Sequence, residues 1–276
     1  MGIKSKQATR PFFAASKKQG RAYYEEAITF EWHSGLSWQQ RQRSSDEMAN
    51  AIAAKYSRIG ISTSQILEIS TASHNHELGC ALSALNLQYT DSVTGITRPV
   101  ENWFQASKVF GNHEVEYGPY TELLNIEKPK KFLNGGHSGK QTGLENDPLF
   151  QRIQSEIVGR SLVKFSMSSI DYPLIPRSAF YDYIYIQALS QEQNEHLASK
   201  LTDYRIFTDI MFNPGTGKNK KYNTQARSCA IFVALSNKGT LSEALLSFDS
   251  FVKVVEYTSE TPQPSQNEHE TLPLFK

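Results

Sequence analysis

The sequence predicts a helix-rich α+β fold in one domain of 276 residues. Three observations support this class. The chain opens with a strand, helix, strand pattern, several later segments have helical spacing and capping residues, and no internal repeat or coiled-coil heptad is present. With a hydrophobic fraction of 39%, a chain of this length can bury a sizeable core.

The two ends of the chain differ in charge from its middle. Residues 1–21 contain six Lys or Arg side chains and no acid, whereas residues 256–276 are acidic and rich in Pro, Ser, Thr and Gln. We therefore expect a basic flexible arm at 1–21, a folded domain at 22–255 and a disordered tail at 256–276. A solvated terminus without a role is the alternative for each end.

Composition also excludes several classes of protein. The formal net charge of +1 gives no global reason to expect nucleic acid or membrane partners. Two cysteines in a chain of this length argue against a disulfide framework and suit a reducing compartment. No stretch resembles a signal peptide or a transmembrane helix, so the sequence predicts a cytoplasmic protein without a membrane partner.

The first third of the chain predicts four elements. A strand at 27–35 closes on Gly35, and a helix at 37–60 begins at the N-cap Ser37 and ends at Gly60. A short strand follows at 65–71. A turn at 91–95 then suggests either a hairpin or extended segments that lead through Pro99 into the next helix.

The remaining chain predicts helices and one long loop. Residues 112–148 are rich in Gly, Lys, Asn and His, which favours a surface loop. Residues 148–165 predict a helix followed by a strand. An aromatic-rich helix at 176–201 and a helix at 223–239 capped by Gly239 follow, and we interpret the aromatic side chains of the former as packing residues.

Several familiar functional motifs are incomplete or absent in this sequence. The stretch PGTGKNKK lacks the first Gly of a phosphate-binding loop, and Asn219 follows Lys218 where Ser or Thr is required. The group His74, His76 and Cys80 has no second ligand cluster, so a polar loop is favoured over zinc. Neither a Gly-x-Ser-x-Gly elbow nor a Gly-x-Gly-x-x-Gly fingerprint is present.

The stretch ENWFQASKVF has a more specific pattern. As a helix over 101–110, closed by Gly111, it places Trp103, Ala106 and Phe110 on an apolar face and Glu101, Gln105 and Lys108 on the opposite face. Spacing alone favours an ordinary solvent face. A carboxylate and an amine so placed nevertheless suit proton transfer and nucleophilic attack on one small substrate.

This stretch resembles the signature helix of the NADAR superfamily of YbiA-like N-glycosidases. The matching positions are Glu101, Phe104, Gln105, Ala106 and Lys108. Upstream, LSALNL resembles the family segment that supplies Asn86. Downstream, FTDIMFNP and KYNTQARSCAIFVAL resemble closing segments that supply Asp209, Asn213 and Asn223, although Ala226 stands where many relatives have Gly. The resemblance spans about residues 78–235 and implies a NADAR-type fold with the strand, helix, strand opening as an addition.

The resemblance implies an N-glycosidase that removes ADP-ribose from guanine in DNA. Such a protein acts as the antitoxin to a DarT-type ADP-ribosyltransferase toxin. In this scheme Lys108 attacks the anomeric carbon to form a Schiff base and Glu101 transfers protons. Neither a metal nor a dissociable cofactor is required, and ADP-ribose is the product.

The remaining implied site residues are ligand contacts. Gln105 and Asn86 orient ribose hydroxyls, and Phe104 or Tyr120 stacks on a base. Lysines of the two basic loops are candidates for contact with the pyrophosphate or the DNA backbone, and for each of them a merely solvated role is the favoured alternative. They are Lys130, Lys131, Lys140, Lys218, Lys220 and Lys221. Three alternatives stay open: hydrolysis of a riboflavin-pathway intermediate, a non-catalytic module that binds ADP-ribose or DNA, and a protein that blocks its toxin by contact.

Overall fold

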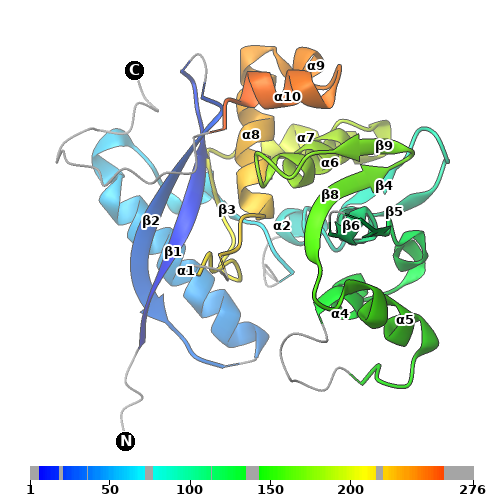
Figure 1. The fold of residues 1–276 in the computed structure, drawn as a ribbon. Coiled ribbons are helices and arrows are strands. Elements are labelled where there is room, and N and C mark those ends of the chain that lie inside the picture. The colour runs from blue at the N-terminus through cyan, green and yellow to red at the C-terminus, as the bar shows by residue number, and fades with distance from the viewer. Residues whose placement is uncertain are drawn as a thin grey trace, which may run out of the picture.

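The computed structural model describes residues 6–18, 21–35, 37–71, 77–112, 114–134, 143–215 and 220–257. In this part of the chain two four-stranded sheets lie on either side of a layer of helices (Figure 1). The α+β class predicted from the sequence is confirmed. None of the described helices is long and apolar enough to cross a membrane.

The first sheet joins the two ends of the domain. Its strand order is β2 (Tyr23–Trp32), β1 (Lys6–Ala15), β10 (Ile206–Thr208) and β3 (Ile66–Glu68). Strand β1 pairs antiparallel with both neighbours, and β10 pairs parallel with β3. This pairing brings segments about 200 residues apart into hydrogen-bond contact.

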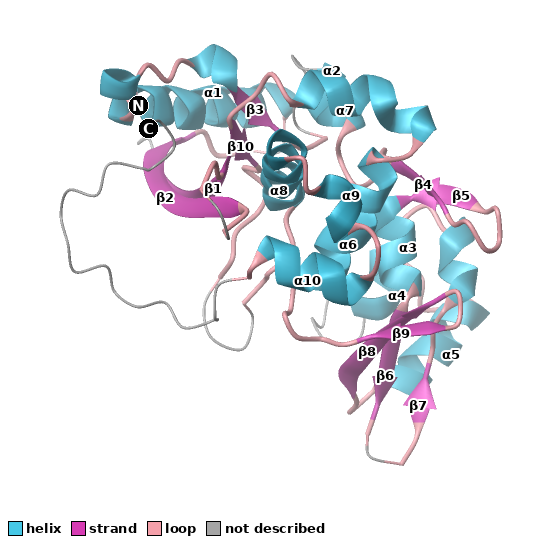
Figure 2. Cartoon of the chain, turned by 90° about the horizontal axis from the view of Figure 1, so that it is seen from above, coloured by secondary structure: helices cyan, strands magenta, loops and turns pink. Residues whose placement is uncertain are grey.

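Alternating side chains of β1 connect this sheet to a helix on each face. Phe12 and Ala14 belong to the core shared with α1 (Trp38–Lys55), whereas Phe13 belongs to the core shared with α8 (Gln225–Lys238). A strand alternates its side chains between the two faces, so one strand supplies both cores. Figure 2 shows α1 and α8 on either side of this sheet.

The expectation of a flexible basic arm at 1–21 is wrong for most of its length. Lys6–Ala15 forms a strand paired on both sides, and only residues 1–5, 19 and 20 fall outside the description. The physical reason is the run Pro11-Phe12-Phe13-Ala14, whose buried apolar side chains outweigh the basic composition. The predicted tail lies outside the described residues from 258 onward.

The other elements of the opening part match the prediction with shifted boundaries. Ser37 caps α1 by accepting a hydrogen bond from the Gln40 amide at 3.3 Å, as predicted. The helix ends at Lys55, and Gly60, with φ of 77°, ends a 3₁₀ turn that follows it. After α2 (Glu77–Ala81), the predicted hairpin is present as β4 (Gln88–Thr90) and β5 (Thr97–Pro99).

The second sheet carries the segment that the sequence analysis singled out. Its strand order is β7 (Glu116–Tyr117), β6 (Lys108–Gly111), β8 (Ser161–Met167) and β9 (Ile170–Tyr172). The described residues of the predicted loop at 112–148 include regular structure, namely a 3₁₀ turn at Thr121–Asn125 and α4 (Pro129–Asn134). The predicted helix at the next segment is α5 (Pro148–Ile157).

The centre of the domain is formed by α6 (Ala179–Leu189) and α8. The aromatic side chains of α6 are buried, which confirms their predicted packing role. A helix that is apolar on all sides must lie inside the fold. The predicted helix at 176–201 is two helices, because the chain leaves helical geometry after Ser190 and resumes as α7 (Glu195–Leu201). Two short helices, α9 (Leu241–Ala244) and α10 (Phe248–Val255), cover α8 and α6.

One buried ion pair joins the two central helices. The Nε atom of Arg227 on α8 donates to Oδ2 of Asp182 on α6 at 3.0 Å, and both side chains are at most 6% exposed. Ser228 and Tyr257 also donate to the same carboxylate, at 2.6 and 3.0 Å. The negative charge of the buried Asp182 carboxylate is thus balanced by Arg227, and hydrogen bonds replace those that water would make.

We predict that Arg227→Met lowers the free energy of unfolding by about 3–5 kcal/mol, because it leaves the Asp182 carboxylate buried without its cation. Urea denaturation measures this loss. The control is Arg152→Met, which removes a surface pair with Glu122 and Glu156 at a side chain that is 45% exposed. The control should lose less than about 1 kcal/mol. Equal losses in the two variants would contradict the assignment.

Candidate active site

The start of α3 (Val100–Ala106) is fixed against the turn that precedes β4. The Glu101 amide donates to the Ala84 carbonyl, and the Val100 amide donates to the Leu87 carbonyl, both at 2.9 Å. Inside the domain, the Asn102 side-chain amide donates to the carbonyl of Ile126 at 2.7 Å. These bonds hold Glu101 at the N-terminal end of a short, anchored helix.

The helix ends earlier than predicted, which changes the setting of Lys108. Helix α3 stops at Ala106, and Lys108 is the first residue of β6, where it pairs with Phe165 of β8. The Ser107 hydroxyl donates to the Trp103 carbonyl at 2.8 Å, and the Ser107 carbonyl accepts from the Ser166 amide at 2.7 Å. The backbone therefore changes from helix to strand at Ser107. As a result, Phe110 lies in β6 rather than on a helical face.

Three polar side chains nevertheless form one hydrogen-bonded chain. The Lys108 amine donates to Oε1 of Gln105 at 2.6 Å, and the Gln105 amide nitrogen donates to Oε1 of Glu101 at 2.9 Å. Gln105 is only 2% exposed, so this is not the ordinary solvent face that spacing alone favours. The side-chain amide of Gln105 therefore bridges the Glu101 carboxylate and the Lys108 amine and fixes their relative orientation.

The surroundings of Lys108 favour its neutral form. Burial lowers the pKa of the Lys108 amine to about 8, Lys130 acts in the same direction, and the Glu101 carboxylate opposes both. The amine lies 4.8 Å from the centre of the Phe104 ring. A lysine with such a pKa has a far larger neutral fraction near physiological pH than an ordinary lysine, and the neutral form is the nucleophile.

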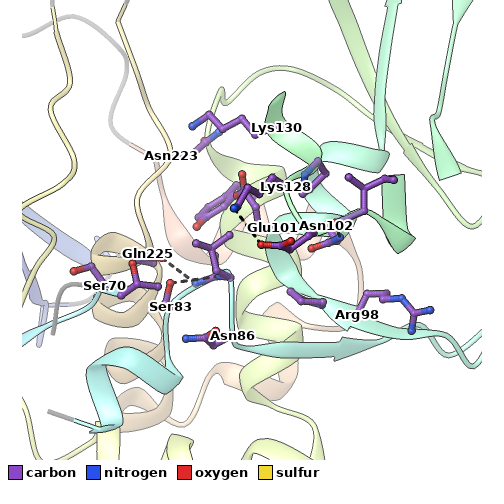
Figure 3. A pocket seen from close by; sticks show the side chains of 18 of the residues that line it. Ser70, Ser83, Asn86, Arg98, Glu101, Asn102, Lys128, Lys130, Asn223 and Gln225 are labelled. Atoms are coloured by element: carbon purple, nitrogen blue, oxygen red, sulfur yellow. Dashed lines mark hydrogen bonds and ion pairs between the residues drawn. The ribbon is translucent and has the colours of Figure 1, made fainter. Parts of the chain in front are cut away.

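Two hollows meet at Glu101. The larger one, called here the cleft, has a volume of about 990 Å³, and the smaller one, called the lysine hollow, has a volume of about 700 Å³ and contains Lys108. Both are lined by Glu101, Tyr181, Asn223, Lys130 and Lys221. Figure 3 shows Glu101 in the cleft, with Lys130 and Asn223 on one side of it and Asn86 on the other.

Most of the predicted ligand contacts line these hollows. Asn86 and Asp209 line the cleft, Phe104 and Gln105 line the lysine hollow, and Asn223 lines both. The Asn86 side chain is exposed, and its amide nitrogen donates to the Cys80 carbonyl at 2.8 Å. The structure therefore brings together residues that are up to 137 positions apart in the sequence.

Two predicted contacts lie elsewhere. Tyr120 is 1% exposed and its ring packs 6.5 Å from that of Phe110, so its position does not support the expected stacking on a base. The physical reason is that the segment folds inward, with the Tyr120 amide donating to the Ala106 carbonyl at 2.7 Å. Asn213 is exposed, lines neither hollow, and accepts a hydrogen bond from Gly215 in its own loop.

A buried carboxyl pair supports the floor of the cleft. Burial, with the neighbouring Glu68 carboxylate adding to it, raises the pKa of Asp209 to about 7. Oδ2 of Asp209 accepts from the Thr224 hydroxyl at 3.1 Å, which ties the N-cap of α8 to the end of β10. Burial also raises the pKa of Glu68, whose oxygens accept from Thr208, Ser70 and the Ile210 amide.

Several lining residues were not singled out by the sequence analysis. Tyr181 lines both hollows although it is only 5% exposed, and the sequence predicts only a packing role for it. Gln225 accepts from the Ala84 amide at 2.9 Å and also donates to the Ile69 carbonyl, joining three segments of the cleft wall. Arg98 and Lys128 add positive charge to the cleft. No local sequence signal marks these positions, because their roles depend on contacts between distant segments.

In the described part of the chain, no group of three or more His, Cys, Asp or Glu side chains is arranged to hold a metal ion. Among the ligands considered for zinc, His74 and His76 lie outside the described residues. Cys80 is described, and its sulfur lies 3.6 Å from the Asn86 amide nitrogen. Lys140 and Lys218, two of the predicted phosphate contacts, also lie outside the description.

The sequence was compared with models of known protein families. The model of one family, described as "DarT1-associated NADAR antitoxin", matches residues 8–144 and 151–265. The chain belongs to the DarT1-associated NADAR antitoxins. A comparison with curated proteins gave no match.

Membership in the NADAR antitoxin family confirms the resemblance and widens it. The match includes β1, β2 and α1, so the strand, helix, strand opening, which the resemblance placed outside the family region, belongs to the NADAR antitoxin domain. The description supports an antitoxin role in association with a DarT1 toxin.

We predict that Lys108 of this NADAR antitoxin reacts with an amine-directed reagent with a midpoint near pH 8, because burial lowers the pKa of its amine. Mass spectrometry of the labelled peptide over a pH series measures the midpoint. In the unfolded protein the same peptide should titrate near the ordinary lysine value of about 10.4. Glu101→Gln should lower the midpoint further, since the carboxylate favours the charged amine; an unchanged or higher midpoint would contradict this electrostatic account.

Proposed function

We propose that the protein is an N-glycosidase that removes ADP-ribose from ADP-ribosylated guanine bases of DNA, and that this reaction is the basis of its antitoxin role. The observation that carries the proposal is a hydrogen-bonded chain of side chains. It runs from Glu101, which lines both hollows, through Gln105 to the Lys108 amine, whose pKa is lowered, in the lysine hollow. An amine and a carboxylate held in this way match the needs of nucleophilic and acid–base catalysis.

The substrate chemistry makes a neutral amine useful. When ADP-ribose is attached through the exocyclic nitrogen of guanine, the ribose ring can open, and the anomeric carbon becomes an imine carbon bonded to that nitrogen. The Lys108 nitrogen adds to this carbon with its electron pair. A new carbon–nitrogen bond thus forms while the carbon–nitrogen double bond to guanine becomes a single bond.

Glu101 supplies and removes the protons of this exchange. Both protons of the neutral Lys108 amine are transferred, one after the other, to the guanine nitrogen by way of Glu101. Guanine then leaves as its free amine with the electrons of its bond to carbon. The resulting Schiff base on Lys108 is attacked by water that Glu101 deprotonates. Both protons of this water end on the lysine nitrogen, the carbon–nitrogen bond to Lys108 breaks to give ADP-ribose, and Glu101 returns to its starting form.

Gln105 acts as a positioning residue. It is hydrogen-bonded at the same time to the Lys108 amine and the Glu101 carboxylate, and its burial restricts other rotamers. The two catalytic groups thereby keep a fixed relation before substrate arrives, which lowers the reorganisation that the reaction requires.

The cleft suits the charge and size of ADP-ribose. Its volume of about 990 Å³ lies at the upper end of the usual range of about 300–1,000 Å³ for small-molecule sites. Its lining contains five cationic side chains suited to a diphosphate, namely Arg98, Lys128, Lys130, Lys131 and Lys221.

We predict that the purified protein releases ADP-ribose from a guanine-ADP-ribosylated oligonucleotide, and that Lys108→Ala and Glu101→Gln each lower the rate at least about 100-fold. Chromatography of released ADP-ribose measures the rate. The control variant Lys253→Ala changes an exposed lysine of α10 that lines neither hollow, so it should keep the full rate. Absence of release by the folded wild type would refute the proposal and favour toxin blocking by contact or a non-catalytic binding role.

We also predict that kcat/KM rises with pH and levels off above about pH 8. The attacking form of Lys108 is neutral, and the amine loses its proton as pH rises through its lowered pKa of about 8. Reduction with borohydride during turnover should attach the ribose to Lys108, as detected by mass spectrometry. A rate that falls with increasing pH across this range would contradict a nucleophilic role for the amine.

A further inference from the structure

The outer rim of the lysine hollow has a composition suited to a polyanion. Its described lining includes one carboxylate, Glu101, and five cationic side chains, namely Lys108, Lys130, Arg177, Lys220 and Lys221. Lys108 is linked to Glu101 through Gln105, whereas Lys130, Arg177, Lys220 and Lys221 are exposed. A row of exposed cations beside a reaction centre attracts phosphates.

An aromatic ring stands among these cations. The Tyr222 ring centre is 4.9 Å from the Arg177 guanidinium carbon and 5.2 Å from the Lys220 amine. Arg177 also donates to the Tyr222 hydroxyl at 3.2 Å. Of the aromatic residues that line the hollow, Phe104, Phe165 and Tyr181 are buried, whereas Tyr222 stays partly exposed. Ile175, which is 72% exposed, adds apolar surface to the same hollow.

The position of Tyr222 is set from inside the domain. The buried Arg227 donates from Nη1 to the Tyr222 carbonyl at 2.6 Å while its Nε atom is paired with Asp182. The backbone under the ring is therefore attached to the central ion pair of α6 and α8. An aromatic ring on a fixed backbone can accept a stacked base with little loss of conformational freedom.

We propose that Arg177, Lys220 and Tyr222 bind the DNA strand next to the modified guanine, with Tyr222 stacked on a neighbouring base and the two cations on phosphates. The inference rests on the proposed function for its orientation. If the anomeric carbon lies between Lys108 and Glu101 and ADP-ribose occupies the cleft, the polynucleotide leaves through the lysine hollow. The protein then distinguishes a modified strand from a modified free nucleoside.

Binding of an unmodified strand tests this surface without requiring catalysis. Fluorescence anisotropy with a labelled single-stranded DNA of about 12 nucleotides should give about a tenfold higher Kd for Tyr222→Leu than for the wild type. Arg177→Gln should reduce the slope of log Kd against log salt by about 0.7, the value for one lost phosphate contact on a single strand. Lys253→Gln is the matched control and should change neither quantity. An unchanged Kd and slope in the folded variants would overturn the inference.

Turnover separates this inference from the proposed function. With the ADP-ribosylated oligonucleotide, Tyr222→Leu should raise KM about tenfold at unchanged kcat, whereas with ADP-ribosylated deoxyguanosine it should leave both constants unchanged. Equal losses on the two substrates would show that Tyr222 contacts the ADP-ribose part, for example its adenine, and would overturn the inference. No release from either substrate by the wild type, with normal strand binding, would refute the glycosidase and retain the DNA surface.

Discussion

The transition from α3 to β6 at Ser107 is the constraint on which the site depends. The Ser107 hydroxyl bonds back into the helix, and its carbonyl accepts from the Ser166 amide of the second sheet. Because the helix stops there, Lys108 begins a strand and its side chain turns back over Phe104 toward Gln105. A continuing helix would not pair Lys108 with Phe165 of β8, so the position of the amine depends on this transition.

The central helices provide the rigid frame around this transition. Helix α8 contributes the buried Arg227 to the pair with α6, and the same arginine fixes the Tyr222 carbonyl. At its N-terminus, Thr224 bonds to Asp209, and Gln225 bonds to the segments around Ala84 and Ile69. Both hollows are therefore built against one helix end, which explains how residues from several distant segments keep a common geometry.

Local patterns in the sequence were sufficient for features that depend on neighbours along the chain. The Ser37 cap, the Gly239 cap and the hairpin around 91–95 follow from side chains that satisfy nearby backbone groups, and the structure contains all three. The four-residue spacing of Glu101 and Gln105 correctly placed their side chains in contact. The order of the motifs along the chain likewise indicates the NADAR family.

Other features were decided only in three dimensions. The basic composition before Arg21 suggested an arm, but pairing with β10 about 200 residues away makes it a strand. The same limit explains why the helix was extended past Ala106 and why Tyr181 was interpreted only as a packing residue. The sequence by itself determined the fold class, the caps and the pair of Glu101 with Gln105, because these depend on local periodicity. The tertiary structure decided burial, strand pairing and the lowered pKa of Lys108, because these depend on contacts between segments that are distant in the chain.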